Sequence, residues 1–296
     1  MGITAIISNI IGRQSEIDSV RQMLASGARL VTLTGPGGVG KTRLAQEICG
    51  LAGGDFPDGV FFIPLDELST PSQVLPKIAS VLEIPESGKQ PILEDLRSAL
   101  AEKHALLCID NWEHVLEAAP QVVELLSACA RLQVLATSRE ALHLRGEQEF
   151  PVAPLRIPSS DDEAQSPAVQ LFVERARAAS PTFGLDISNA STVAAICAFL
   201  DGLPLAIELA AALVRLFSLP ALLKRLQVDP TLAGRSTTLQ LLTGGARDLP
   251  VRQQTLRAAI GWSYDLLDGP DQRLFRRLSI FSGGCELDAA GTVCGE

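Results

Sequence analysis

The sequence contains little that would support metal chemistry or a membrane span. Only three of its 296 residues are histidines, His104, His114 and His143, and because they form no metal-ligating or nucleophile constellation we expect structural or surface roles for them. No apolar run reaches the ~18 residues that a membrane span needs. The N-terminal segment MGITAIISNI lacks the basic start of a secretory signal. The sequence therefore predicts a cytoplasmic protein without membrane contact.

Cysteine motifs and an excess of basic residues are absent as well. The six cysteines lie in apolar segments without a C-x-x-C pair, and we expect buried, reduced thiols. They are Cys49, Cys108, Cys129, Cys197, Cys285 and Cys294. The net charge of −9 argues against this chain itself gripping a nucleic-acid backbone. Any contact with DNA would need a domain outside this chain.

Apolar residues, by contrast, are plentiful. Hydrophobic residues make up 47% of the chain, which is enough for a sizeable core, and its length predicts two or three domains. From about residue 30 to residue 154, apolar runs of strand length alternate with helical patterns; the runs are RLVTLTG, GVFFIPL, ALLCIDN, LQVLATS and EFPVAPL. This alternation predicts an α/β domain with a parallel sheet between two helical layers and a ligand at the carboxyl ends of the strands.

The second half of the chain has a helical pattern. A polar, Pro- and Ser-rich stretch, RIPSSDDEAQSP, is typical of a linker, and four segments with apolar residues three and four apart follow it. They are AVQLFVERARAA, ASTVAAICAFL, PLAIELAAALVRLF and LPALLKRLQ. After a second break, LTGGARDLP, further helices are predicted on either side of DGP, and another helical start lies near the last residue. We expect domains at residues 1–157, 158–243 and 244–296, and a longer protein of which this chain is a piece.

The segment GPGGVGKT, residues 35–42, fits the phosphate-loop pattern G-x-x-x-x-G-K-[ST]. It lies between a strand-like run and a helix-like run, as the pattern requires. Glycines let backbone N–H groups approach a triphosphate, the helix start adds its positive dipole end, Lys41 supplies a point charge and Thr42 offers a hydroxyl to Mg²⁺. The alternative is a Gly-rich turn before an amphipathic helix. The predicted nucleotide contacts in and beside this loop are Gly35, Gly37, Gly38, Val39, Gly40, Lys41, Thr42 and Arg43.

Asp110 ends the apolar strand ALLCID, a position suited to an acid that binds Mg²⁺ beside a phosphate loop. The alternative is an ordinary acid that caps the next helix. Asn111 follows where many hydrolytic relatives have a second acid, and an amide cannot act as a general base near neutral pH. Glu113 could take that role, although an exposed first-turn glutamate that favours the helix dipole explains it equally well.

Arg139 follows another apolar strand, LQVLATS, at the same predicted edge. A guanidinium there can contact the γ-phosphate and so distinguish ATP from ADP. The alternative is a surface arginine paired with Glu140 or Glu147.

The order of the motifs resembles that of the STAND class of signal-transduction ATPases, and most closely the bacterial NB-ARC-type ATPase modules of large multidomain transcriptional regulators. The segments that carry this resemblance are IIGRQSEI, GPGGVGKTRLA, LLCIDNWEHV, LATSRE, DGLPLAIELAA and TLRAAIGWSYDLL with QRLFRRLSIF. They cover nearly the whole chain. The resemblance implies a P-loop domain, an all-helical domain and the start of a winged-helix domain.

The resemblance also implies roles for individual residues. Gly12 and Arg13 match the segment placed against the adenine, and Gly202 and Pro204 match a G-x-P turn whose proline packs on the base. Lys41 and Thr42 match the phosphate and magnesium pair, Asp110 the Mg²⁺-associated acid and Arg139 the sensor arginine. Asn111 departs from the pattern, which argues against fast hydrolysis.

The predicted function is therefore an ATP/ADP switch that hydrolyses ATP slowly, with Lys41, Asp110, Glu113 and Arg139 as its catalytic residues and ATP/ADP with Mg²⁺ as its ligands. We expect it to self-associate in the ATP state and to reach DNA only through another domain. Two alternatives stay open at this point: an NTPase with sustained turnover, and an interaction scaffold stabilised by nucleotide.

Overall fold

The computed structural model describes residues 10–158, 165–227, 242–243, 254–265, 267–281 and 285–294. The chain forms two compact units, Met1–Gln227 and Val228–Glu296. The finer boundaries expected near residues 157 and 243 stay a prediction.

The first unit contains a five-stranded parallel sheet, which confirms the predicted α/β fold. Its strands are β1 (Leu30–Thr34), β2 (Val60–Pro64), β3 (Leu106–Asp110), β4 (Gln133–Thr137) and β5 (Glu147–Pro151), in the order β2-β3-β4-β1-β5. Every residue of β1, β3 and β4 is buried, as continuous apolar runs in a covered parallel sheet require. The carboxyl ends of β1, β3 and β4 therefore meet at one edge.

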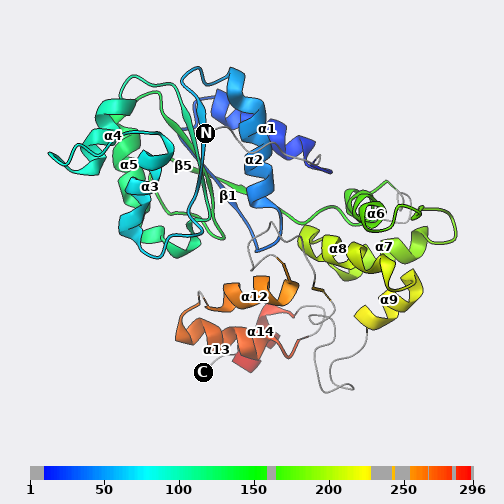
Figure 1. The fold of residues 1–296 in the computed structure, drawn as a ribbon. Coiled ribbons are helices and arrows are strands. Elements are labelled where there is room, and N and C mark those ends of the chain that lie inside the picture. The colour runs from blue at the N-terminus through cyan, green and yellow to red at the C-terminus, as the bar shows by residue number, and fades with distance from the viewer. Residues whose placement is uncertain are drawn as a thin grey trace. The chain divides into compact units, whose positions relative to one another are not determined.

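Helices cover both faces of this sheet (Figure 1). Helices α1 (Gln14–Ala25) and α2 (Lys41–Leu51) pack on one face, and α3 (Val74–Val81), α4 (Ile92–Leu100) and α5 (Ala119–Ala128) pack on the other. Successive strand residues alternate between the two cores: Leu106 and Cys108 belong to the first, and Leu107 and Ile109 to the second. Short 3₁₀ turns occupy Ala52–Gly54, Pro71–Gln73, Trp112–His114 and Leu116–Ala118.

The predicted helices after the linker are also present in the first unit. They are α6 (Pro167–Ala179), α7 (Ala190–Phe199), α8 (Pro204–Ala211) and α9 (Leu219–Leu226). Ser166 caps α6 by accepting a hydrogen bond from the Val169 N–H at 3.3 Å. The segment PLAIELAAALVRLF was expected to form one helix, but α8 ends at Ala211 and a 3₁₀ turn, Ala212–Arg215, follows. Such a tightened last turn satisfies carbonyls that have no partner further along an α-helix.

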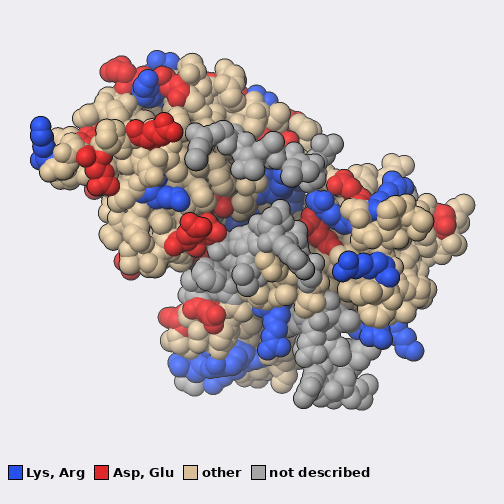
Figure 2. Space-filling model, in the orientation of Figure 1, with Lys and Arg blue, Asp and Glu red and all other residues tan. Residues whose placement is uncertain are grey.

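The second unit contains α12 (Leu256–Asp265), α13 (Gly269–Leu278) and α14 (Leu287–Cys294). Asp268 caps α13 by accepting the Asp271 N–H at 2.8 Å, so the DGP segment separates two helices as predicted. The Tyr264 and Phe275 rings meet edge to face at 5.8 Å and join α12 to α13. Basic side chains gather over α13 (Figure 2), and those of its own sequence are Arg273, Arg276 and Arg277.

The prediction of buried, reduced thiols is right for four of the six cysteines. Cys49, Cys108, Cys129 and Cys197 are buried free thiols, but Cys285 is exposed and Cys294 is half-exposed. The prediction of burial is thus wrong for the last two, because Cys285 lies in an exposed stretch before α14, and α14, which ends at Cys294, has no buried side chain. Within the described ranges, no helix is long and apolar enough to cross a bilayer.

Arg29 is expected to stabilise the first unit. Its guanidinium donates to the carbonyls of Leu132 at 2.7 Å, Leu126 at 2.6 Å and Cys129 at 2.5 Å, and two of these carbonyls end α5. Arg29→Ala should lower the free energy of unfolding by about 2 kcal/mol, because half-buried carbonyls lose a charged donor. Urea unfolding measures this change. The exposed Arg177→Ala is the control, and an equal loss in the two variants would refute the assignment.

Candidate functional site

The loop between β1 and α2 contains three glycines with positive φ angles, Gly35 (142°), Gly38 (81°) and Gly40 (99°). A Cβ atom on Gly35 would lie 2.7 Å from the Val152 carbonyl oxygen, whereas one on Gly40 would meet no atom within 4 Å and would fill open space. The loop therefore needs glycine for its backbone path, and at Gly40 it leaves room for a ligand to approach the backbone. Gly37 lies in the same loop, and the Val39 side chain is buried in the core, so only its backbone faces the loop.

Lys41 is the first residue of α2 and its side chain turns back over this loop. Its Nζ donates to the carbonyl oxygens of Gly35 at 2.6 Å and Pro36 at 3.1 Å, and the residue is only 9% exposed. Burial lowers the pKa of the Lys41 ammonium, and the negative charge of Glu113 opposes this effect. The ammonium is thus held over the loop by backbone acceptors that a phosphate oxygen can replace.

Asp110 joins the phosphate loop to the neighbouring strands. Its Oδ1 accepts hydrogen bonds from the Thr42 hydroxyl at 2.8 Å and the Thr137 hydroxyl at 2.5 Å. Burial raises the pKa of the Asp110 carboxyl, and these two hydrogen bonds act in the opposite direction. The 3₁₀ turn after β3 has no side-chain cap, so Asp110 does not cap the next helix as the alternative proposed. A hydroxyl and a carboxylate in contact are a donor set suited to Mg²⁺ beside phosphates.

Asn111 adopts a left-handed backbone conformation, with φ of 72°, and helps to order the turn that follows. Its N–H donates to the Thr137 hydroxyl at 2.9 Å, and its Nδ2 lies 3.2 Å from His114 Nδ1. His114 Nε2 lies 2.8 Å from the Leu65 carbonyl oxygen, and since a carbonyl only accepts, Nε2 carries the proton and Nδ1 accepts from Asn111 in the neutral ring. His114 thus has the structural role expected for it.

Glu113 and Arg139 form an ion pair at the same edge, with 3.2 Å between Arg139 Nε and Glu113 Oε1. Their side chains are 10% and 20% exposed, respectively. Arg139 was expected to bind either phosphate or one of two other acids; Glu147 instead accepts the backbone N–H groups of Leu142 and Leu144. The alternative of an exposed first-turn glutamate is wrong for Glu113, because the turn packs its side chain inward against Arg139.

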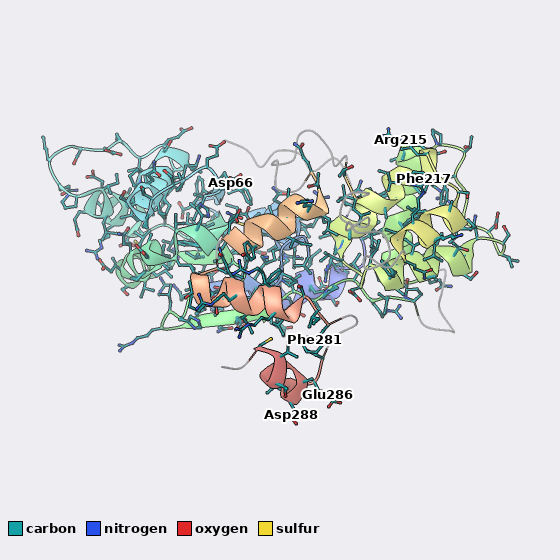
Figure 3. All side chains as sticks on the ribbon, turned by 90° about the horizontal axis from the view of Figure 1, so that it is seen from below. Asp66, Arg215, Phe217, Phe281, Glu286 and Asp288 are labelled. Carbon is teal, nitrogen blue, oxygen red and sulfur yellow. The ribbon has the colours of Figure 1, made fainter. Side chains whose placement is uncertain are left out.

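Asp66 is a further acid here that the sequence analysis missed. It lies in the loop after β2 (Figure 3), and the Leu65 N–H beside it donates to the Asp110 carbonyl oxygen at 3.0 Å. Its charge is one of the smaller causes that raise the pKa of Asp110. The pattern of an acid directly after an apolar strand, which pointed to Asp110, could have found it.

Gly12 and Arg13 lie at the start of α1 and contact both the loop and the helical region. Arg13 Nη2 donates to the carbonyls of Val39 at 3.1 Å and Ala153 at 2.7 Å, and Nη1 pairs with Glu16 at 2.7 Å. A Cβ atom on Gly12 would lie 2.3 Å from Pro167 Cβ, so this glycine packs tightly against the first turn of α6. The Arg13 guanidinium therefore holds the chain around the loop through these protein acceptors.

The G-x-P turn brings the helical region to the phosphate loop. Pro204 is the first residue of α8, and the next N–H, that of Leu205, donates to the Gly38 carbonyl oxygen at 3.2 Å. Gly202 accepts a hydrogen bond from the Leu155 N–H at 2.9 Å. Leu205 and Leu155 are contacts that no sequence pattern identified, because both are ordinary core leucines in the sequence.

Arg43 on α2 lies among charged side chains of the helical region. It pairs with Glu47 at 3.9 Å, and burial lowers its pKa, with further effects from Glu47, Arg175 and Glu208. Arg175 Nε on α6 donates to Glu208 Oε1 on α8 at 3.1 Å. The predicted nucleotide contact by Arg43 stays a prediction.

Residues 22–151 match the family described as AAA domain. The chain is 36% identical to the uncharacterised protein Rv0894 of Mycobacterium tuberculosis over 288 residues, which are 97% of this chain and 69% of that protein. The chain belongs to the family of Rv0894. Residues 22–151 thus form an AAA-type P-loop ATPase domain, in agreement with the phosphate loop and the parallel sheet.

The Rv0894 family has longer relatives. Over 277 residues the chain is 42% identical to Rv0890c of M. tuberculosis, whose name assigns it provisionally to the HTH-type transcriptional regulators; these residues are 93% of this chain but 29% of that protein. The chain thus spans less than a third of this relative. Among solved structures, ORC2 of Aeropyrum pernix, described as ADPNP-ADP complexes, shares the fold with a TM-score of 0.51 at 13% identity, over 97% of this chain and 81% of that one.

Proposed function

We propose that this member of the Rv0894 family is an ATP/ADP-binding switch of the STAND class, with an NB-ARC-type arrangement, and the regulatory core of a multidomain transcriptional regulator. The observation that carries the proposal is the meeting of Lys41, the Thr42–Asp110 pair and Arg139 at the ends of β1, β3 and β4. The regulator name of the longer relative supports the second half of the proposal. The solved neighbour with the same fold is described with ADPNP and ADP.

In this proposal the phosphate loop donates its N–H groups to the phosphates and Lys41 neutralises the β- and γ-phosphates. Thr42 and Asp110 hold Mg²⁺, which supplies further neutralisation of phosphate charge. Arg139 reads the γ-phosphate. Gly12 and Arg13 on one side and Gly202 and Pro204 on the other enclose the base.

A switch needs contacts that differ between ATP and ADP, because a nucleotide shifts two conformations only through its differential affinity for them. Arg139 is the group whose contact depends on the γ-phosphate, while Pro204 and Leu205 connect the helical region to the loop. We propose self-association in the ATP form, and DNA contact through a domain outside this chain. Hydrolysis is slow because Asn111 is an amide where a second acid would activate water.

Arg139→Ala tests this assignment. If Arg139 reads the γ-phosphate, the variant should raise the Kd for a non-hydrolysable ATP analogue by roughly 10-fold, the equivalent of about 1.4 kcal/mol, and change that for ADP by less than about 2-fold. Calorimetry with the 296-residue chain and Mg²⁺ measures both constants. The exposed Arg145→Ala serves as the control. Equal effects of Arg139→Ala on the two nucleotides would contradict a sensor role.

The alternatives make different predictions for the unaltered chain. Brisk steady-state phosphate release would favour an NTPase with sustained turnover over a switch. Identical small-angle scattering with ADP and with the ATP analogue would favour a scaffold that binds nucleotide only for stability.

A further inference from the structure

Both cations at the candidate site already have protein acceptors. Lys41 donates to the Gly35 and Pro36 carbonyls, and Arg139 donates to Glu113. The two positive charges on Lys41 and Arg139 are matched by the negative charges of Asp110 and Glu113, and Asp66 adds a further negative charge near Asp110. A triphosphate that binds here must therefore exchange these internal contacts for its own, since no cation of this set is unpaired.

The contact between Arg139 and Glu113 is suited to such an exchange. Within the described part of the chain it rests on a single hydrogen bond from Arg139 Nε at 3.2 Å, instead of the two parallel bonds of a strong arginine–carboxylate pair. Its geometry therefore makes it a replaceable contact. The backbone of Arg139 is fixed independently, because its carbonyl accepts the Gly35 N–H at 3.4 Å. The guanidinium can thus change partner while the backbone of Arg139 stays in place beside the phosphate loop.

The other oxygen of the glutamate points to a ligand as well. The Glu113 side chain is nine-tenths buried, and its Oε2 atom is buried too. Even so, Oε2 has no hydrogen-bond partner among the described residues. A carboxylate that served only to anchor Arg139 would be expected to use both oxygens, because a buried polar atom without a partner is unfavourable. The negative charge of Glu113 also raises the pKa of Lys41 against the effect of burial.

We propose that the Glu113–Arg139 ion pair is a latch that the γ-phosphate of ATP opens, and that the released Glu113 is the general base of the slow hydrolysis. The inference rests on the proposed function. In the latched form Arg139 is held away from nucleotide and Glu113 is neutralised. In the opened form Arg139 donates to the γ-phosphate. Glu113 then accepts a proton from a water molecule whose oxygen bonds to the γ-phosphorus. The bond between the γ-phosphorus and the β-phosphate oxygen breaks, and the products are ADP and inorganic phosphate.

The latch explains how a site with an amide at Asn111 can still hydrolyse ATP slowly. The base becomes available only when Arg139 has changed partner, so the same event that reads the γ-phosphate prepares its removal. ADP has no γ-phosphate to attract Arg139, and with ADP the pair stays closed.

A double-mutant cycle on nucleotide affinity tests the latch without relying on activity. Calorimetry gives the Kd of a non-hydrolysable ATP analogue with Mg²⁺ for the native chain, Glu113→Gln, Arg139→Ala and the double variant. If ATP must break the pair, Glu113→Gln should tighten analogue binding by about 10-fold when Arg139 is present and by at most ~2-fold in the Arg139→Ala background. The Kd for ADP should change by less than about 2-fold in each variant, because ADP leaves the pair closed.

A permanent ion pair predicts the opposite order for the two effects of Glu113→Gln, with and without Arg139. If Arg139 stayed on Glu113 in the ATP complex it would screen the glutamate from the phosphates, so Glu113→Gln would help more when Arg139 is absent. That order would overturn the latch. Glu140→Gln, next to Arg139 but exposed, is the matched control. If the native chain bound neither nucleotide, the proposed function itself would fail, whereas a reversed order refutes the latch alone.

Phosphate release supplies the readout for the base. Glu113→Gln should slow single-turnover hydrolysis by about 100-fold although it binds the analogue more tightly, because the amide cannot accept the proton. Unchanged hydrolysis in this variant would overturn the assignment of Glu113 as base.

Discussion

Lys41→Ala is expected to weaken the binding of ATP and ADP by about 100-fold or more, the largest effect on affinity of any single change at the site. The reason is that the Lys41 ammonium is a charged group in a buried site. The ammonium is 9% exposed and held over the loop by two carbonyls, so a phosphate that replaces those carbonyls meets a cation with little water around it. Removing a charged donor that contacts ligand at such a site costs about 3 kcal/mol, which corresponds to this change in Kd.

The fold should survive Lys41→Ala. The aliphatic stem contributes little to the core, and the Gly35 and Pro36 carbonyls lie in a loop that water can reach once the side chain is shortened. Fluorescence titration with labelled ADP and ATP gives the affinities, and thermal unfolding checks the fold. Lys103→Ala is the control: Lys103 is half-exposed, pairs with Asp58 at 3.0 Å and lies away from the strand ends that form the site. Native affinity in Lys41→Ala would contradict the phosphate-loop assignment.

The strands and the loop could be predicted from the sequence because their causes are local. Continuous apolar runs such as LLCID can be stable only when both faces of the strand are covered. A Gly-rich turn between such a strand and an apolar-periodic helix is typical of a phosphate-binding loop. For this reason the first four strands lie within one residue of the predicted runs, whereas β5 begins two residues before the run EFPVAPL and ends four residues before its end. The helices α6 to α9 follow from their three- and four-residue spacing.

The partners of the polar side chains could not be predicted in the same way. Glu113 and Arg139 are 26 residues apart, and their contact depends on β3 and β4 being neighbours in the sheet, which the order of strands along the chain does not determine. The sequence analysis offered Arg139 two acids near it in sequence, and neither was correct. Arg13 is a similar case, since its acceptor at Ala153 lies 140 residues away. Local patterns identify which groups are present at an edge, while tertiary topology decides which of them pair.

Gly202→Ala is expected to have the largest effect on stability and to release ADP faster. Gly202 has φ of 66°, and a Cβ atom built there would lie 2.1 Å from the Leu155 carbonyl oxygen. The substitution therefore combines an unfavourable backbone conformation with a clash against backbone that cannot rotate away, and we expect a loss of about 4 kcal/mol in the free energy of unfolding. Gly184→Ala is the matched control, because Gly184 has an ordinary φ and open space around its Cα.

The nucleotide effect follows from what this glycine positions. Its carbonyl accepts the Leu155 N–H, and two residues later Pro204 begins the helix whose Leu205 N–H binds the Gly38 carbonyl of the phosphate loop. Relief of the clash moves the turn, and α8 with it, away from the loop. If the helical region encloses the base, stopped-flow release of labelled ADP from Gly202→Ala should be about 10-fold faster than from the native chain, the equivalent of about 1.4 kcal/mol. Pro204→Ala should change the rate less and in the same direction, because it loosens the first turn of α8 without a clash. A Gly202→Ala protein that is less stable but releases ADP at the native rate would show that the turn supports the fold and plays no part in holding the nucleotide.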